Sequence, residues 1–191
     1  MLDSRIDQFD QIVKMRKDST EALMDYWIDF SLYTTLEYWF MVALLLVPLL
    51  VLFLKIDKSK IFLIGFFGYS CHVISFYINL LGINMGMWHY PIHLFPSIPS
   101  FSIDASLVPV TLMLIYQWSL NKKKNYYLYA LIFTMFFSFV FEPIIVSMGL
   151  FKLYGDVNYL FRFINYALIA IIAKLITDAF LWIQEMYRKS H

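Results

Sequence analysis

Charged side chains are scarce in this sequence, and a long part of it has none. Lys, Arg, Asp and Glu make up 15% of the 191 residues, and none of them occurs in 61–103. A typical soluble domain has about 25% charged and about 45–50% apolar residues, whereas the hydrophobic fraction here is 61%. Too few polar side chains remain to cover a surface in water, which excludes an ordinary soluble domain and indicates a protein of the lipid bilayer.

Cysteine is also scarce, the net charge is close to zero, and we expect no cleaved signal peptide. A single cysteine, Cys71, excludes an intrachain disulfide, and no zinc or thiol-redox motif is present. The formal net charge of +1 does not indicate a nucleic-acid partner. The first ten residues have no apolar core of a signal peptide, so we expect internal helices to drive insertion. We predict neither a cofactor nor a metal ion.

Five apolar segments follow one another along the chain. They are 38–54, 61–82, 105–120, 126–150 and 159–183. Each is near the roughly 20 residues that a helix needs to cross a hydrocarbon core. No internal repeat is visible, so an inverted-repeat transporter is not supported. The sequence predicts an all-α polytopic membrane protein whose domain, 37–191, is a bundle of five transmembrane helices.

Residues 1–36 are the polar part of the chain. Apolar residues recur there at the spacing of one helix face: Leu2, Ile6, Phe9 and Val13. This pattern predicts an amphipathic helix that lies on the membrane surface or against the bundle. A solvated helical extension of the first span is an equal alternative. No separate folded domain is expected, because too little apolar surface is available to form a core.

Basic residues predict the orientation of the bundle. They cluster after the first, third and fifth spans, at Lys55, Lys58 and Lys60, at Lys122, Lys123 and Lys124, and at Arg188 and Lys189. The positive-inside rule then places the N-terminus outside the cell membrane and the C-terminus in the cytoplasm. The basic residues of 1–36 begin about 20 residues from the first span, near the limit of that rule's reach.

The segment 85–104, with the sequence MGMWHYPIHLFPSIPSFSID, is the most informative connection. Its three prolines disfavour a helix, yet it is aromatic and contains no charge before Asp104. We expect it to lie at a membrane interface or to fold back on the helix ends as a lid. The favoured structural role of Trp88 and Tyr90 is that of interfacial anchors. The structural prediction for Asp104, beside its functional ones, is the N-cap of the third span.

Three spans carry stripes of small and polar residues at helical spacing, which we interpret as packing faces turned towards the bundle centre. The stripes are Gly65, Gly68, His72, Ser75 and Asn79; Thr134, Ser138 and Glu142; and Ala167, Ala170, Lys174 and Asp178. A charge inside the bilayer costs at least about 2.5–3.5 kcal/mol, and Lys174 and Asp178 can pair on one face. Glu142 has no basic residue near it in sequence, and Pro143 removes a helical donor. We expect Glu142 to be protonated and to donate to His72, to a backbone carbonyl or to water.

Two carboxyl groups and a histidine are expected together at the outer end of the bundle. The candidate catalytic residues are Glu142, Asp104 and His89, and the candidate binding residues are Trp88, Tyr90, His72 and Glu142. Such groups can form a proton relay, an acid for chemistry on a lipid or a metal site, and none has a diagnostic spacing here. His89 and His93 have the spacing of helical metal ligands, but Pro91 disfavours a helix between them, so no metal site is predicted.

One ordered set of residues resembles a known family. The set is Trp88-His89-Tyr90-Pro91, Asp104, Pro109-Val110, Tyr116-Gln117 and Glu142-Pro143. It resembles a family of small, uncharacterised multi-pass membrane proteins of spore-forming Gram-positive bacteria, over about 85–155, and implies no activity. The Trp-x-Tyr element also resembles the membrane domains of heterodimeric lycopene cyclases. Their acidic pair is absent, because Ala105 follows Asp104, so this resemblance implies only an apolar ligand near acidic groups.

Three functions are compatible with these observations. The favoured one is a non-enzymatic bacterial membrane protein that acts as a structural or accessory component of the cell envelope or spore membrane. The second is a lipid- or isoprenoid-binding enzyme that uses Glu142 and Asp104. The third is a proton or ion pathway through Asp104, Glu142 and His72, which a chain this small would form as an oligomer. The expected partners are membrane lipids and either a second copy of the chain or another membrane protein.

Overall fold

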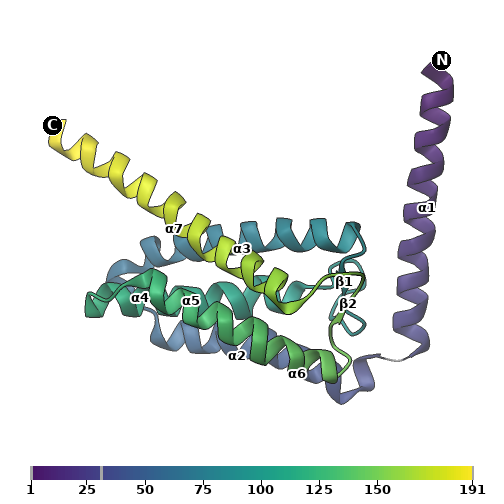
Figure 1. Cartoon of the computed structure of the whole chain (residues 1–191), viewed down its shortest axis with the longest axis horizontal. Coiled ribbons are helices and arrows are strands. Elements are labelled where there is room, and N and C mark those ends of the chain that lie inside the picture. Colours follow the sequence, from purple (N-terminus) through teal and green to yellow (C-terminus); the bar gives the residue numbers. More distant parts are fainter. Residues whose placement is uncertain (1, 31, 191) are drawn as a thin grey trace.

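The structure, a computed structural model, describes 2–30 and 32–190 of the chain, with side chains in 4–30 and 33–189 (Figure 1). The α-helices are α1 (Leu2–Asp29), α2 (Leu36–Lys55), α3 (Ile61–Asn84), α4 (Val108–Lys122), α5 (Tyr126–Phe136), α6 (Glu142–Ser147) and α7 (Tyr159–Ser190). The other elements are two 3-10 helices, η1 (Leu32–Thr34) and η2 (Lys58–Lys60), two π-helical segments, η3 (Ile103–Leu107) and η4 (Phe137–Phe141), and two strands, β1 (Trp88–His89) and β2 (Lys152–Leu153).

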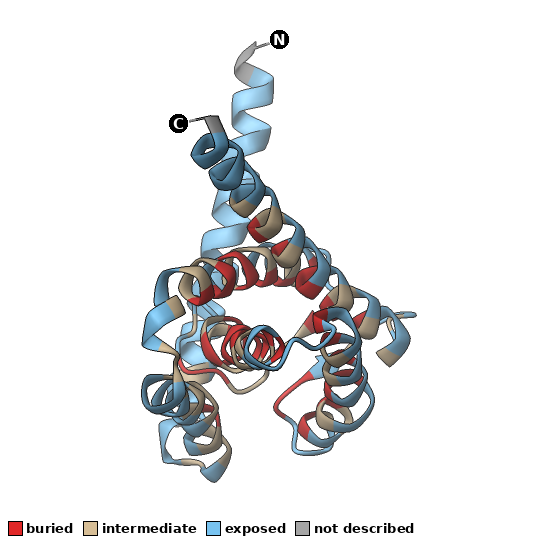
Figure 2. Cartoon of the chain, turned by 90° about the vertical axis from the view of Figure 1, so that its left-hand side faces the viewer, coloured by how far each residue is buried: buried red, intermediate tan, exposed pale blue. Residues whose placement is uncertain are grey.

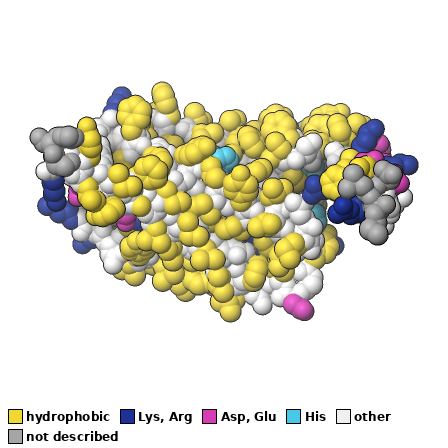
Figure 3. Space-filling model, turned by 90° about the horizontal axis from the view of Figure 1, so that it is seen from above, with side chains coloured by type: hydrophobic (Ala, Val, Ile, Leu, Met, Phe, Trp, Pro, Cys, Tyr) yellow, Lys and Arg dark blue, Asp and Glu magenta, His cyan; other side chains and the backbone are white. Residues whose placement is uncertain are grey.

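Five helical segments of the described chain are long and apolar enough to cross a membrane, which confirms the predicted number of apolar helices. They are Leu36–Lys55, Lys58–Asn84, Ile103–Lys122, Tyr126–Ser147 and Tyr159–Lys189. The fourth is shorter than predicted because the chain turns at Gly149, which has a φ of 73°. Hydrophobic side chains cover the sides of the bundle, and most Lys and Arg side chains lie towards its two ends (Figure 3).

Buried side chains gather on the helix faces that point to the centre of the bundle (Figure 2). The predicted packing stripes lie on these faces, because Ser75, Asn79, Thr134, Ser138 and Ala170 are all buried. Of the five apolar segments, Ile103–Lys122, which contains α4, is the most enclosed. In its most apolar stretch of 18 residues 56% are buried, against 6% in that of α2. The α4 helix therefore occupies the middle of the bundle and α2 its periphery.

The two π-helical segments lie where the spans carry their carboxyl groups. Pro143, in the first turn of α6, has no backbone N–H, and η4 precedes it with the N–H of Glu142 bonded to the carbonyl of Phe137. The widened turn accommodates the proline within a continuous helix. The η3 segment begins one residue before Asp104, whose N–H donates to Ser100 O at 3.0 Å. Asp104 is therefore inside the helix, and its prediction as an N-cap is wrong.

The 85–104 connector folds back against the bundle as a lid. Its strand β1 pairs with β2 of the α6–α7 connection in antiparallel register, with Trp88 opposite Leu153. Trp88 is 1% exposed and Tyr90 is 3% exposed. Their prediction as interfacial anchors is wrong, because both side chains have hydrogen-bond partners inside the bundle.

Helix α1 runs crosswise to the other helices at the connector end of the bundle (Figure 1). It contacts the bundle through its C-terminal half, where the indole Nε1 of Trp27 donates to His93 O at 3.2 Å. Its N-terminal half extends past the side of the bundle (Figures 1 and 2). Most of its described side chains are exposed.

Candidate functional site

Asp104 is a fully buried carboxyl group that is held by α3. Its Oδ1 accepts hydrogen bonds from Ser75 Oγ and from Asn79 Nδ2, both at 2.6 Å. Residues four apart share one helix face, so Ser75 and Asn79 reach the same oxygen. The backbone carbonyl of Asp104 lies 2.8 Å from His72 Nδ1. The candidate residues Asp104 and His72 therefore meet, but through the main chain rather than through the carboxyl group.

Asn79 joins this carboxyl group to the connector. Its Oδ1 accepts from Trp88 Nε1 at 2.9 Å and from Tyr90 Oη at 3.0 Å, while its amide nitrogen donates to Asp104. Burial raises the pKa of Tyr90, the positive charge of Arg162 opposes this shift, and the phenol stays a neutral donor. Gly82 lets the Trp88 ring lie against α3, because a Cβ at this position would be 1.9 Å from the ring.

Glu142 is the second buried carboxyl group, and it forms an ion pair. Its Oε1 accepts from Arg162 Nε and from Tyr166 Oη, each at 2.8 Å, and Arg162 Nη2 also donates to Tyr166 Oη at 2.5 Å. The side chains of Glu142 and Arg162 are both 1% exposed. Glu142 does not donate to His72 or to a backbone carbonyl, as two of the expected partners would require, because its Oε1 accepts from a guanidinium group and a phenol.

The partner of Glu142 has a signal in the sequence, although the two residues are not close along the chain. Arg162 is a basic residue near the start of the fifth span, and Glu142 lies near the end of the fourth. Consecutive antiparallel helices joined by a short connection place such positions at a similar depth. A buried charge needs a compensating partner, so the opposite charge across this connection was the pairing to predict.

Arg162 also connects the two carboxyl groups through aromatic rings. Its Cζ lies 4.2 Å from the ring centroid of Trp88, 5.0 Å from that of Phe151 and 4.9 Å from that of Tyr166. These are cation–π distances. Trp88 thus donates to Asn79 on the Asp104 side and covers the guanidinium group on the Glu142 side. We define the polar cluster by these contacts: Ser75, Asn79, Trp88, Tyr90, Asp104, Glu142, Arg162 and Tyr166.

The remaining histidine candidates lie outside the polar cluster. His89, on β1, packs edge-on against Tyr154 at 5.8 Å between ring centroids, and partial burial lowers its pKa. His93 is buried, its Nδ1 lies 3.0 Å from Tyr90 O, and burial lowers its pKa as well. No group of three His, Cys, Asp or Glu in the described residues could hold a metal ion.

The predicted pairing of Lys174 with Asp178 on one face of the fifth span is confirmed. Lys174 donates to Asp178 one turn further along α7. The ammonium group of Lys174 also lies 5.5 Å from the ring centroid of Tyr116, on α4. This pair lies away from the connector, towards the other end of α7, and is separate from the polar cluster.

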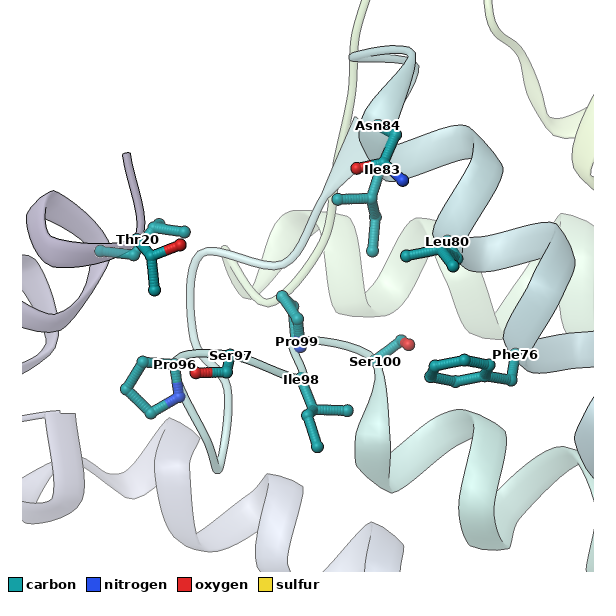
Figure 4. A pocket seen from close by; sticks show the side chains of 11 residues that line it. Thr20, Phe76, Leu80, Ile83, Asn84, Pro96, Ser97, Ile98, Pro99 and Ser100 are labelled. Atoms are coloured by element: carbon teal, nitrogen blue, oxygen red, sulfur yellow. The ribbon is translucent and has the colours of Figure 1, made fainter. Parts of the chain in front are cut away.

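A cleft at the connector end of the bundle lies outside the polar cluster (Figure 4). It has a volume of about 230 Å³ and lies between α1, the end of α3 and the connector. Its walls are Thr20 and Leu23, Phe76, Leu80, Ile83 and Asn84, and 96–100. No residue of the polar cluster lines this cleft or any of three further hollows in the described part of the chain.

Comparison of the chain with protein-family models, with curated proteins and with solved structures finds no match. The two resemblances described above therefore stay predictions.

Proposed function

We propose that this chain is a non-enzymatic integral membrane protein, a structural or accessory component of a bacterial cell envelope or spore membrane. One observation carries the proposal: Asp104, Glu142 and Arg162 are each at most 1% exposed, and none of them lines the cleft or the three further hollows described above. A catalytic acid or base must come within hydrogen-bond reach of its substrate. The polar cluster instead fastens the connector to α3, α6 and α7.

The contacts of the polar cluster also argue against a proton or ion pathway. Its hydrogen bonds lie at the connector end of the bundle, and the Lys174–Asp178 pair lies further along α7. Between them α7 presents the buried apolar side chains of Ile169, Ala170 and Ala173. The guanidinium group of Arg162 is a fixed positive charge, and such a charge forms a barrier to protons and other cations.

A conservative change at Asp104 tests the proposal. Asp104→Asn keeps the size of the side chain and an oxygen that accepts from Ser75 and Asn79, but it removes the acid. We expect a strain with this variant to keep whatever phenotype distinguishes wild type from a deletion, with the protein still folded. Asp156→Asn, in the exposed α6–α7 connection, is the matched control.

Loss of that phenotype with an unchanged melting temperature would overturn the proposal and favour an enzyme or a proton pathway. Mass spectrometry of molecules that co-purify in mild detergent distinguishes these further. A stoichiometric lipid or isoprenoid, enriched over the bulk lipid, would support the lipid-binding alternative.

The proposed orientation keeps the N-terminus outside and the C-terminus in the cytoplasm. It is supported by the structure's arrangement, because the α2–α3 and α4–α5 connections and the end of α7 lie at the same end of the bundle (Figure 1). We expect Lys123→Cys to resist an impermeant thiol reagent in intact cells and to react after lysis. The native Cys71 is buried, and the labelling of the wild-type protein at this residue gives the background signal. Labelling of position 123 in intact cells would contradict this orientation.

A further inference from the structure

The face of α1 that contacts the bundle is defined by four residues. Arg16 donates to Asn84 Oδ1 at 3.3 Å, and Trp27 donates to the carbonyl of His93. Between them Thr20 and Leu23 line the cleft against α3 and the connector (Figure 4). The intervals of four, three and four residues place all of these on one side of the helix. This side of α1 therefore points towards the body of the bundle.

The same face continues into the N-terminal half of α1, where it is apolar and uncovered. Counting back from Arg16 at helical intervals gives Val13, Phe9 and Ile6. These side chains are 50%, 63% and 52% exposed. Their half of the helix extends past the side of the bundle (Figure 1), so the protein itself does not cover them.

The charged residues of α1 also differ between its two faces. The side away from the bundle carries acidic residues and one lysine, which follow at intervals of seven, four, three and four: Asp7, Lys14, Asp18, Glu21 and Asp25. Arg5 and Arg16, eleven residues or about three turns apart, lie on the side with Phe9. The face towards the bundle thus combines apolar side chains with guanidinium groups, and the opposite face is mainly acidic.

We propose that α1 is an interfacial anchor that binds the anionic headgroup layer of the bilayer at the connector end. The proposal rests on the five apolar helices crossing that bilayer. Their axes then run along the membrane normal, so a helix lying crosswise to them lies in the membrane plane, and its bundle-facing side faces the hydrocarbon. Ile6, Phe9 and Val13 enter the boundary between headgroups and acyl chains, and Arg5 and Arg16 meet lipid phosphates.

Two fluorophore positions on opposite faces of α1 test this proposal. In a Cys71→Ala background, Phe9→Cys and Asp7→Cys are labelled in the full-length protein and reconstituted in vesicles of phosphatidylcholine with phosphatidylglycerol. We expect nitroxide-labelled lipid to quench the label at position 9 several-fold more than the label at position 7. Aqueous iodide should show the reverse order. Melting temperatures equal to that of the Cys71→Ala parent show that both variants are folded.

The test of the headgroup contact uses one charge on each face. Arg5→Gln should reduce lipid quenching at position 9 in phosphatidylglycerol vesicles, and it should have no effect in pure phosphatidylcholine. Lys14→Gln removes the same charge from the opposite face and should have no effect in either lipid. Equal iodide quenching at positions 7 and 9 would overturn the proposal, because α1 would be solvated. Protection of position 9 from both quenchers would also overturn it, because a second copy of the chain would then cover this face.

Discussion

Arg162→Met is expected to lower the free energy of unfolding by about 3–5 kcal/mol, because it leaves a buried carboxylate without its cation. Glu142 and Arg162 are both 1% exposed, so water cannot replace the lost partner. The same change removes the charge that lies over the Trp88 ring at 4.2 Å. The lid should therefore loosen together with the helices. Denaturant or thermal unfolding of the purified protein in mild detergent measures the loss.

A double variant separates the lost pair from the lost packing. Glu142→Leu combined with Arg162→Met replaces both charges by apolar side chains, so it should recover most of the stability that Arg162→Met loses. Lys174→Met is the matched control for removing a cation from α7. Its partner Asp178 is 43% exposed, so the cost should be at most about 1 kcal/mol. If Arg162→Met cost no more than Lys174→Met, the pair would not fasten the lid.

Gly82→Ala is expected to displace the lid and to cost about 1–3 kcal/mol or more through overpacking. The new Cβ would lie 1.9 Å from Cζ2 of Trp88. That ring cannot retreat easily, because Asn79 holds its Nε1 and Arg162 lies over its face. Protease cutting of the connector between Tyr90 and Pro99, compared with wild type in the same detergent, should reveal the displaced lid.

Two other glycines of α3 provide graded controls for this change. Nothing lies within 4 Å of a Cβ at Gly65, so Gly65→Ala should stabilise the helix by about 0.5–1 kcal/mol. At Gly68 a Cβ would meet the flexible side chain of Met113, which can move aside, so the cost should be smaller than at Gly82. Equal stability of the Gly82 and Gly65 variants would show that Trp88 is not held against α3.

The sequence by itself determined the number and type of the long apolar helices. An apolar run of this length can pair its backbone N–H and C=O groups inside a bilayer by forming a helix. It also determined which face of α3 points inwards, since Ser75 and Asn79 lie on the predicted stripe and are buried. The three prolines of 85–104 correctly excluded a regular helix through the connector. The pairing of Lys174 with Asp178 followed from their spacing of four residues on one helix.

Only the tertiary structure decided the contacts between different helices and the connector. Glu142 and Arg162 are twenty residues apart, and local spacing on one helix says nothing about such a pair. Tryptophan is a residue type typical of membrane interfaces. The ring of Trp88 nevertheless lies inside the bundle against Arg162, where β1 pairs with β2. Burial of Asp104 likewise depends on two donors from α3, which outweigh its local preference for a helix N-terminus. In each case the deciding free energy comes from a partner distant in sequence, because a buried polar group is stable only where another segment satisfies it.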